Sequence, residues 1–240
     1  MLKYKTIISI YMLLILFSSL TPCLANSAEP PSILIIVSNA PDDLEISINS
    51  KDSLYKSNKV NKKIETYFLF YNSEIQMRNV NDYNLKISTN KENYEIKFDK
   101  PIKTYSNVYT LNLNSKILTE GKNLSRSILL VALRIVLTIS IEAFVFLLFK
   151  FKNKKSYISF IIINLITQGA LNIWINGFIP SQGYLIFSLI IGEFFVFAFE
   201  IVAFLIFVKE HKKFRTILYV ISANALSLIV GGFIITILPI

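Results

Sequence analysis

Residues 184–208 read YLIFSLIIGEFFVFAFEIVAFLIFV, an apolar run in which Glu193 and Glu200 are the only charged side chains. A helix needs about 20 apolar residues to cross the hydrocarbon core of a bilayer, and this run is long enough. A charged side chain at that depth is costly and normally faces other protein rather than lipid. The stretch therefore predicts a membrane-spanning helix that belongs to a bundle.

Three further apolar runs of similar length accompany this one in the second half of the chain. We expect the four runs to form four membrane-spanning helices, so the lipid bilayer is the first expected partner. The composition agrees, because 53% of all residues are hydrophobic and only 17% are charged. The three other runs are residues 127–149, 156–178 and 216–238.

The formal charge of +9 is concentrated beside the apolar runs. Residues 29–125 are nearly neutral, whereas basic clusters lie at residues 150–155 and 209–215, and the turn at residues 179–183 is uncharged. The positive-inside rule therefore predicts both clusters in the cytoplasm, and the turn, the C-terminus and residues 29–125 outside. This distribution indicates membrane topology rather than nucleic-acid binding.

Residues 1–28 have the organisation of an export signal. A basic start precedes an apolar stretch at residues 6–20, whose length of about 15 residues is short for a span. Small residues precede two candidate cleavage points, after Ala25 and after Ala28. We expect the signal to be removed, and Cys23, the only cysteine, to be lost with it. The mature chain is then expected to have neither disulfides nor thiol chemistry.

Residues 29–125 are expected to form a small antiparallel β sandwich. Short runs in this region alternate apolar and polar residues, which is typical of half-buried strands. Turn-forming residues at 39–43 and 89–93 have the length that joins two strands in a hairpin. Residues 64–71 (IETYFLFY) fit a strand or a helix, because their apolar run has no clear period. The expected strands are residues 32–37, 44–48, 83–88, 94–98 and 108–113.

The fold class predicted for the chain is therefore an α+β membrane protein. A signal peptide (1–28) precedes an extracytoplasmic β-rich domain (29–125) and a four-helix transmembrane bundle (126–240). The export signal and the charge rule agree on one location, which is the cell membrane of a bacterium. The β domain and the C-terminus are expected on the outside.

Polar residues within the apolar runs share one face of each helix and fall at two depths. Glu142, Asn164, Glu200 and Asn224 each lie about three or four residues to the cytoplasmic side of the midplane. They are the predicted intramembrane polar site. Two carboxylates in a low dielectric cannot both remain charged at low cost, so at least one should be protonated, unless a cation occupies the site.

Arg134 and Glu193 lie a similar distance to the outer side of the midplane. Their charges are opposite, so they are predicted to form an ion pair. A second interpretation of all these residues remains open, in which neutral glutamate and asparagine side chains join helices by hydrogen bonds of about 1 kcal/mol each. The identity of any bound metal is left open.

Four segments of the helices carry a resemblance to known proteins. They are LTISIEAFVFLLF (137–149), INLITQ (163–168), GEFFVFAFEIVAF (192–204) and YVISANALSLIVGG (219–232). With the signal and the EPPS start at residues 29–32, the chain resembles an uncharacterised family of Gram-positive bacterial multi-pass membrane proteins with an extracytoplasmic β-rich domain. The resemblance implies no activity. It covers Glu142, Asn164, Gln168, Glu193, Glu200, Asn224 and Ser227.

Two classes of function fit these observations. The first is an interaction or assembly module that displays the β domain to another membrane subunit or a cell-wall polymer. The alternative is a small transporter or channel component that uses the intramembrane acidic site for protons or cations. An intramembrane enzyme ranks third, because the carboxyls could act as acid and base, but the only histidine, His211, lies in a basic loop and no serine has a basic partner. No catalytic residue or cofactor is expected.

Overall fold

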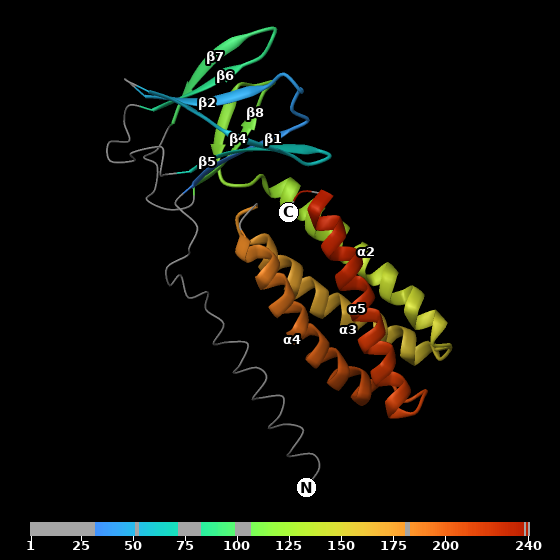
Figure 1. The fold of residues 1–240 in the computed structure, drawn as a ribbon. Coiled ribbons are helices and arrows are strands. Elements are labelled where there is room, and N and C mark those ends of the chain that lie inside the picture. The colour runs from blue at the N-terminus through green and yellow to red at the C-terminus, as the bar shows by residue number, and fades with distance from the viewer. Residues whose placement is uncertain are drawn as a thin grey trace. The chain divides into compact units, whose positions relative to one another are not determined.

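The computed structural model describes residues 32–50, 53–71, 83–98, 107–180, 183–237 and 239. The predicted signal peptide and its cleavage points lie outside these residues. The described chain has a β-rich part followed by four long helices, which confirms the predicted fold class (Figure 1). The strands are β1 (Ser32–Ser38), β2 (Glu45–Ser50), β3 (Ser53–Lys56), β4 (Asn58–Asn61), β5 (Glu65–Tyr71), β6 (Asn84–Ser88), β7 (Asn93–Lys97), β8 (Asn107–Asn112) and β9 (Ile117–Glu120). The helices are α2 (Leu124–Leu148), α3 (Lys154–Asn176), α4 (Gly183–Phe207) and α5 (Lys213–Ile237).

The strands form a sandwich of two sheets. One sheet has the order β4-β5-β1-β8-β9 and the other β3-β2-β6-β7. Neighbouring strands are antiparallel with one exception among the described residues, because β1 and β8 pair in parallel, with Ile33 opposite Asn107. Apolar side chains of both sheets meet in one core, as the sandwich requires. That core contains Ile33, Ile35, Val37, Phe68, Phe70, Tyr109 and Leu111 from the first sheet and Ile46, Ile48, Leu85 and Ile87 from the second.

The central strand of the five-stranded sheet, β1, and its neighbour β5 are buried on both faces. This explains why residues 64–71 have no clear period, since a strand with two covered faces is apolar at successive positions. One face of each strand belongs to the sandwich core. The opposite face forms a second cluster of Leu34, Ile36, Tyr67 and Leu69, to which Ile179 from the loop between α3 and α4 contributes.

The first of the two predicted hairpins is wrong. Residues 39–43 carry the chain from the five-stranded sheet to the other sheet, so β1 and β2 are not paired. Both edges of β1 are already occupied, by β5 and by β8, which leaves no edge for β2. The second hairpin is confirmed: β6 pairs with β7, and the turn is closed by the Thr89 N–H donating to the Glu92 carbonyl oxygen at 2.9 Å.

Helices α2 to α5 are all long and apolar enough to cross a membrane, so the four apolar runs do form four long helices as predicted. Asparagine caps two of them, because the side-chain oxygen of Asn123 accepts from Ser125 N–H at 2.9 Å and that of Asn153 accepts from Lys155 N–H at 3.0 Å. In the bundle, α2 and α4 each contact both α3 and α5 (Figure 1). The polar stripes of the four helices can therefore converge in one interior.

Among the described glycines, Gly192 of α4 allows the closest approach of a neighbouring helix, which is α3. A Cβ atom at Gly192 would stand 2.4 Å from Leu171 Cδ1 and 3.0 Å from a ring carbon of Trp174. By contrast, a Cβ at Gly231 would have no atom within 4 Å. The spacing of Ala223, Ser227 and Gly231 suggests close helix approach on α5, but at Gly231 the backbone borders open space instead.

Candidate intramembrane site

Each helix buries polar side chains in the bundle and leaves large apolar side chains exposed where lipid would lie. Examples of exposed residues are Val136, Ile166, Phe194 and Ile229. The sequence-predicted site residues are all on the buried side, apart from Arg134, which is half-buried. The buried polar residues are Glu142 on α2; Ser156, Asn164, Thr167, Gln168 and Asn172 on α3; Glu193 and Glu200 on α4; and Thr216, Asn224 and Ser227 on α5.

The carboxyl of Glu200 is hydrogen bonded on both oxygens. Thr167 Oγ1 of α3 donates to Oε1 at 2.6 Å, and Asn224 Nδ2 of α5 donates to Oε2 at 2.6 Å. Glu200 is 1% exposed, so these two donors replace water for a group that would be costly to bury alone. Three helices therefore meet at one carboxyl.

Glu142 of α2 completes this arrangement. Ser227 Oγ donates to Glu142 Oε1 at 3.4 Å, and Glu142 interacts electrostatically with Glu200. Tyr219 on α5 lies against Asn164 and interacts with both carboxyls. The structure thus brings together the four residues of the predicted polar site, Glu142, Asn164, Glu200 and Asn224. With Thr167, Tyr219 and Ser227 we call them the carboxyl cluster.

Thr167 and Tyr219 are members that sequence reasoning missed. Thr167 lies three residues after Asn164, so the helical period would have placed it on the same face. Tyr219 has no such signal, because an aromatic residue in an apolar run is usually part of a core. Here its ring does pack in a core, with Phe146, Phe151 and Phe204.

A cavity of about 50 Å³ lies in the half of the bundle nearer the β domain. Arg134 and Glu193 both line it, but within the described chain they do not form a salt bridge. Arg134 Nη2 instead donates to the Pro239 carbonyl oxygen at 3.3 Å. Gln168, Asn172 and Ser227 also line this space, which we call the β-proximal cavity.

The donor set of the carboxyl cluster suits protons better than a metal ion. Among the described residues no three His, Cys, Asp or Glu side chains are placed to hold a metal. The cluster contains two carboxyls, a phenol, two amides and two aliphatic hydroxyls, and a carboxyl can exchange a proton with a neighbouring hydroxyl or water.

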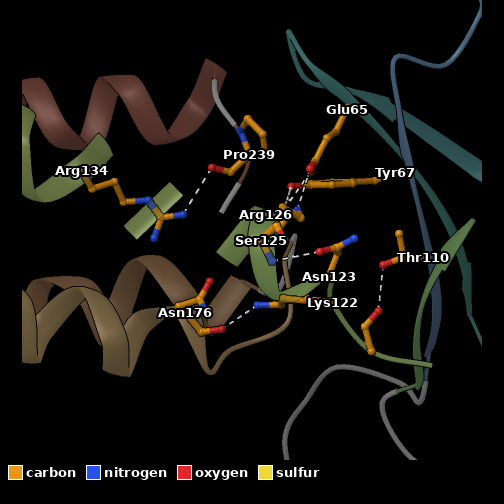
Figure 2. A network of polar contacts seen from close by, with 11 residues as sticks. Glu65, Tyr67, Thr110, Lys122, Asn123, Ser125, Arg126, Arg134, Asn176 and Pro239 are labelled. Carbon is orange, nitrogen blue, oxygen red and sulfur yellow. Dashed lines mark hydrogen bonds and ion pairs between the residues drawn. The ribbon is translucent and has the colours of Figure 1, made fainter. Parts of the chain in front are cut away.

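A second buried polar network joins the β domain to the bundle, as Figure 2 shows. Arg126 in the first turn of α2 donates to both oxygens of Glu65 in β5, and also to the Tyr67 hydroxyl at 3.1 Å. Lys122 donates to the carbonyl oxygens of Asn176, the last residue of α3, and of Phe178, just beyond that helix. Burial, with the positive charges of Arg126 and Arg134, lowers the pKa of Lys122 to about 8.

At the opposite end of the bundle, a carboxylate links the loop between α4 and α5 to the start of α3. Glu210, in the loop between α4 and α5, accepts from Lys152 N–H at 2.6 Å and from Asn153 N–H at 3.0 Å, at the start of α3. Slight desolvation raises the pKa of the Glu210 carboxyl, but these two hydrogen bonds and a third with Ser156 outweigh it. The pKa of Glu210 is therefore lowered. A carboxylate at a helix N-terminus also interacts favourably with the helix dipole.

The fold and the site define a class, a multi-pass membrane protein with a β-sandwich domain and a buried polar bundle interior. Comparison takes the chain no further, because no family model, curated protein or solved structure matches it. The predicted resemblance to a Gram-positive family therefore stays a prediction.

Proposed function

We propose that this protein is an interaction or assembly module of the bacterial cell membrane, in which the bundle holds the β sandwich as a fixed platform for a partner. One observation carries the proposal, the buried double hydrogen bond between Arg126 and Glu65. A domain that only needed to be tethered would not require a charged pair buried at its junction. A partner that must be met in a defined orientation does benefit from such rigidity.

The basic clusters at residues 150–155 and 209–215 support an orientation with the sandwich and the C-terminus outside the cell. In this arrangement the five-stranded sheet faces the bundle through Glu65 and Tyr67. The four-stranded sheet then presents its outer face to the extracytoplasmic space.

That outer face is polar, which fits a polar partner such as a cell-wall polymer or the outer part of another membrane subunit. Glu95 on β7 accepts from Asn49 at 3.4 Å and from Asn84 at 3.1 Å, so neighbouring strands present an ordered set of polar groups. Lys86 and Lys97 lie on the same face by alternation. Such a surface also remains soluble without a partner.

Site-specific photocrosslinking in intact cells tests the proposal. A photoreactive amino acid at Lys86 or Glu95 should give a discrete crosslinked species, either a protein adduct or a polymer adduct that wall hydrolases shift. The same probe at Ser115, in the turn between β8 and β9, is the matched exposed control. Equal crosslinking from all three positions, or from none, would remove the interaction role.

The second candidate is a small transporter or channel component for protons or cations. The specific observation in its favour is the carboxyl cluster, where Glu142 and Glu200 lie within the spans and interact with each other. Glu142→Gln and Glu200→Gln keep the size of each side chain but remove its acid function. Proton or cation transport by the full chain in proteoliposomes should then be lost while the bundle stays folded. If the two glutamates only pack the helices together, both the transport and the folding should be unchanged.

A further inference from the structure

The β-proximal cavity connects the end of the bundle to its interior. Pro239, which lies past the end of α5, is on its wall, and so is Ser227 in the middle of that helix. Those twelve positions correspond to about 15–18 Å along the bundle axis. The cavity wall therefore extends from the end near the β domain to the depth of the carboxyl cluster.

Polar atoms on this wall lack partners within the described protein. They are Glu193 Oε2, Gln168 Nε2 and Arg134 Nη1. Glu193 and Gln168 are more than nine-tenths buried, at 6% and 1% exposure. Buried polar groups almost always bond to protein or to ordered water. The polar wall is thus built for a small polar ligand that can both donate and accept hydrogen bonds.

The volume identifies the ligand. A buried water needs at least about 10–15 Å³ of cavity volume and two to four polar partners. The cavity of about 50 Å³ therefore holds roughly three waters. An organic substrate is too large. A hydrated metal ion is disfavoured as well, because the positively charged guanidinium of Arg134 is on the wall.

The surroundings of Glu193 allow its carboxyl to gain and lose a proton. Arg134 of α2 lines the same cavity without forming a salt bridge to it among the described residues, and Glu142 of α2 and Glu200 of α4 interact with it electrostatically. From α3 and α5 the wall receives only uncharged polar groups, those of Gln168, Asn172 and Ser227. Water in the cavity can donate to an ionised carboxyl and accept from a protonated one, so both protonation states are accessible.

We propose that the β-proximal cavity is a proton-exchange site in which Glu193 is the acid. Hydronium in the cavity gives its proton to Glu193 Oε2, so that one O–H bond breaks in the hydronium, one forms on the carboxyl and a water molecule remains. Ser227, which lies on the wall and donates to Glu142 at 3.4 Å, extends the route to the carboxyl cluster. This inference deepens the second candidate function and is independent of any partner of the β domain.

The test is infrared difference spectroscopy on the full chain in lipid nanodiscs. The C=O band of the protonated Glu193 carboxyl should follow the bulk pH and shift within the mixing time when H₂O is replaced by D₂O. Glu193→Gln should lose that band. If the band responds to Na⁺ at constant pH, or does not respond to pH or to D₂O, the proposal is overturned.

A second variant tests the route rather than the acid. Gly231→Leu adds a side chain to the cavity wall, at a position where a Cβ meets no atom within 4 Å, and leaves every polar residue in place. This variant should slow the exchange of hydrogen for deuterium on the Glu193 carboxyl, which is measured from its C=O band. Gly169→Leu is the matched control, because Gly169 is also helical with open space at Cβ but is outside the cavity lining. Unchanged exchange in Gly231→Leu, with the helix content of the wild type, would overturn the route.

If Gly231→Leu loses helix content, Gly231→Ala replaces it with a smaller obstruction and the same expected direction. Proton flux into proteoliposomes separates this inference from the function on which it rests. Exchange at Glu193 without net flux supports the site and removes the transporter candidate. The absence of both removes both.

Discussion

Arg126 and Glu65 form a buried ion pair, with Nε donating to Oε1 at 2.6 Å and Nη2 donating to Oε2 at 2.8 Å. Their side chains are only 9% and 3% exposed. The two residues are far apart in the chain, one in β5 and the other in the first turn of α2. Their contact joins the sandwich to the first helix of the bundle.

Removal of one partner should be much more harmful than removal of both. Arg126→Leu leaves a buried carboxylate without its counter-charge, which costs about 3–5 kcal/mol in comparable sites. Arg126→Leu with Glu65→Leu should recover much of that loss. Unfolding in detergent by circular dichroism measures it. Lys116→Leu is the control, because its pair with Glu92 is about half exposed and such pairs contribute at most about 1 kcal/mol.

Lys122 should make stability depend on pH in the alkaline range. Its pKa is about 8 in the folded protein, below the ordinary 10.5, so the charged form is disfavoured by folding. Between these two values the unfolded chain binds more protons, and stability should rise as pH increases from about 8 to 10.5.

The neutral variant Lys122→Met isolates this contribution from that of other lysines. The difference in melting temperature between wild type and Lys122→Met, measured from pH 7 to 11, should move in favour of the wild type through that window. A difference that stays constant with pH would show that Lys122 keeps its proton as an exposed lysine does.

A side chain at Gly192 should destabilise the packing of α3 against α4. Gly192→Ala places a methyl group 2.4 Å from Leu171 Cδ1, so α3 and α4 must separate or repack. Overpacking of this kind typically costs about 1–3 kcal/mol. Gly169→Ala has open space and should be neutral or slightly stabilising, because alanine favours helix. Equal stability of the two variants in thermal unfolding would contradict the predicted contact.

The hydroxyl of Thr167 should contribute to the stability of the bundle through its hydrogen bond to Glu200. Thr167→Val keeps the shape but removes the donor to Glu200 Oε1, which should destabilise the bundle by about 1–3 kcal/mol. Thr167→Ser should restore most of the loss. Ser140→Ala is the control, because Ser140 is exposed and donates only to Val136 of its own helix. Chemical denaturation monitored by tryptophan fluorescence compares the variants, and an indifferent Thr167→Val would show that the hydroxyl is not needed.

Topology is a prediction from the basic clusters. Reporters fused after Lys154 and after Lys213 should be active in the cytoplasm, and those near Ser181 and at the C-terminus should be active outside. Paired enzyme fusions with opposite compartment requirements make the measurement. A cytoplasmic C-terminus would reject the proposed orientation of the β domain.

The turn at residues 39–43 shows why topology within the sandwich escaped the sequence. Its residues form a tight turn, as predicted, with Leu44 N–H donating to the Pro41 carbonyl oxygen at 3.1 Å. Local chemistry specifies that the chain reverses, but not which strand edge is free to receive it. That choice depends on β5 and β8, which occupy both edges of β1 from distant parts of the chain.

The sequence by itself determined the four spans, the β-rich character of the preceding domain and the faces on which Glu142, Asn164, Glu200 and Asn224 lie, because length, apolar period and depth are local properties. Only the tertiary structure decided which hydroxyls and amides bind Glu200, and that Arg134 donates to Pro239 while sharing a cavity with Glu193. It alone paired Arg126 with Glu65. Hydrogen bonds and ion pairs require atoms within about 3 Å of one another, and such proximity between distant residues is set by how all the elements pack together.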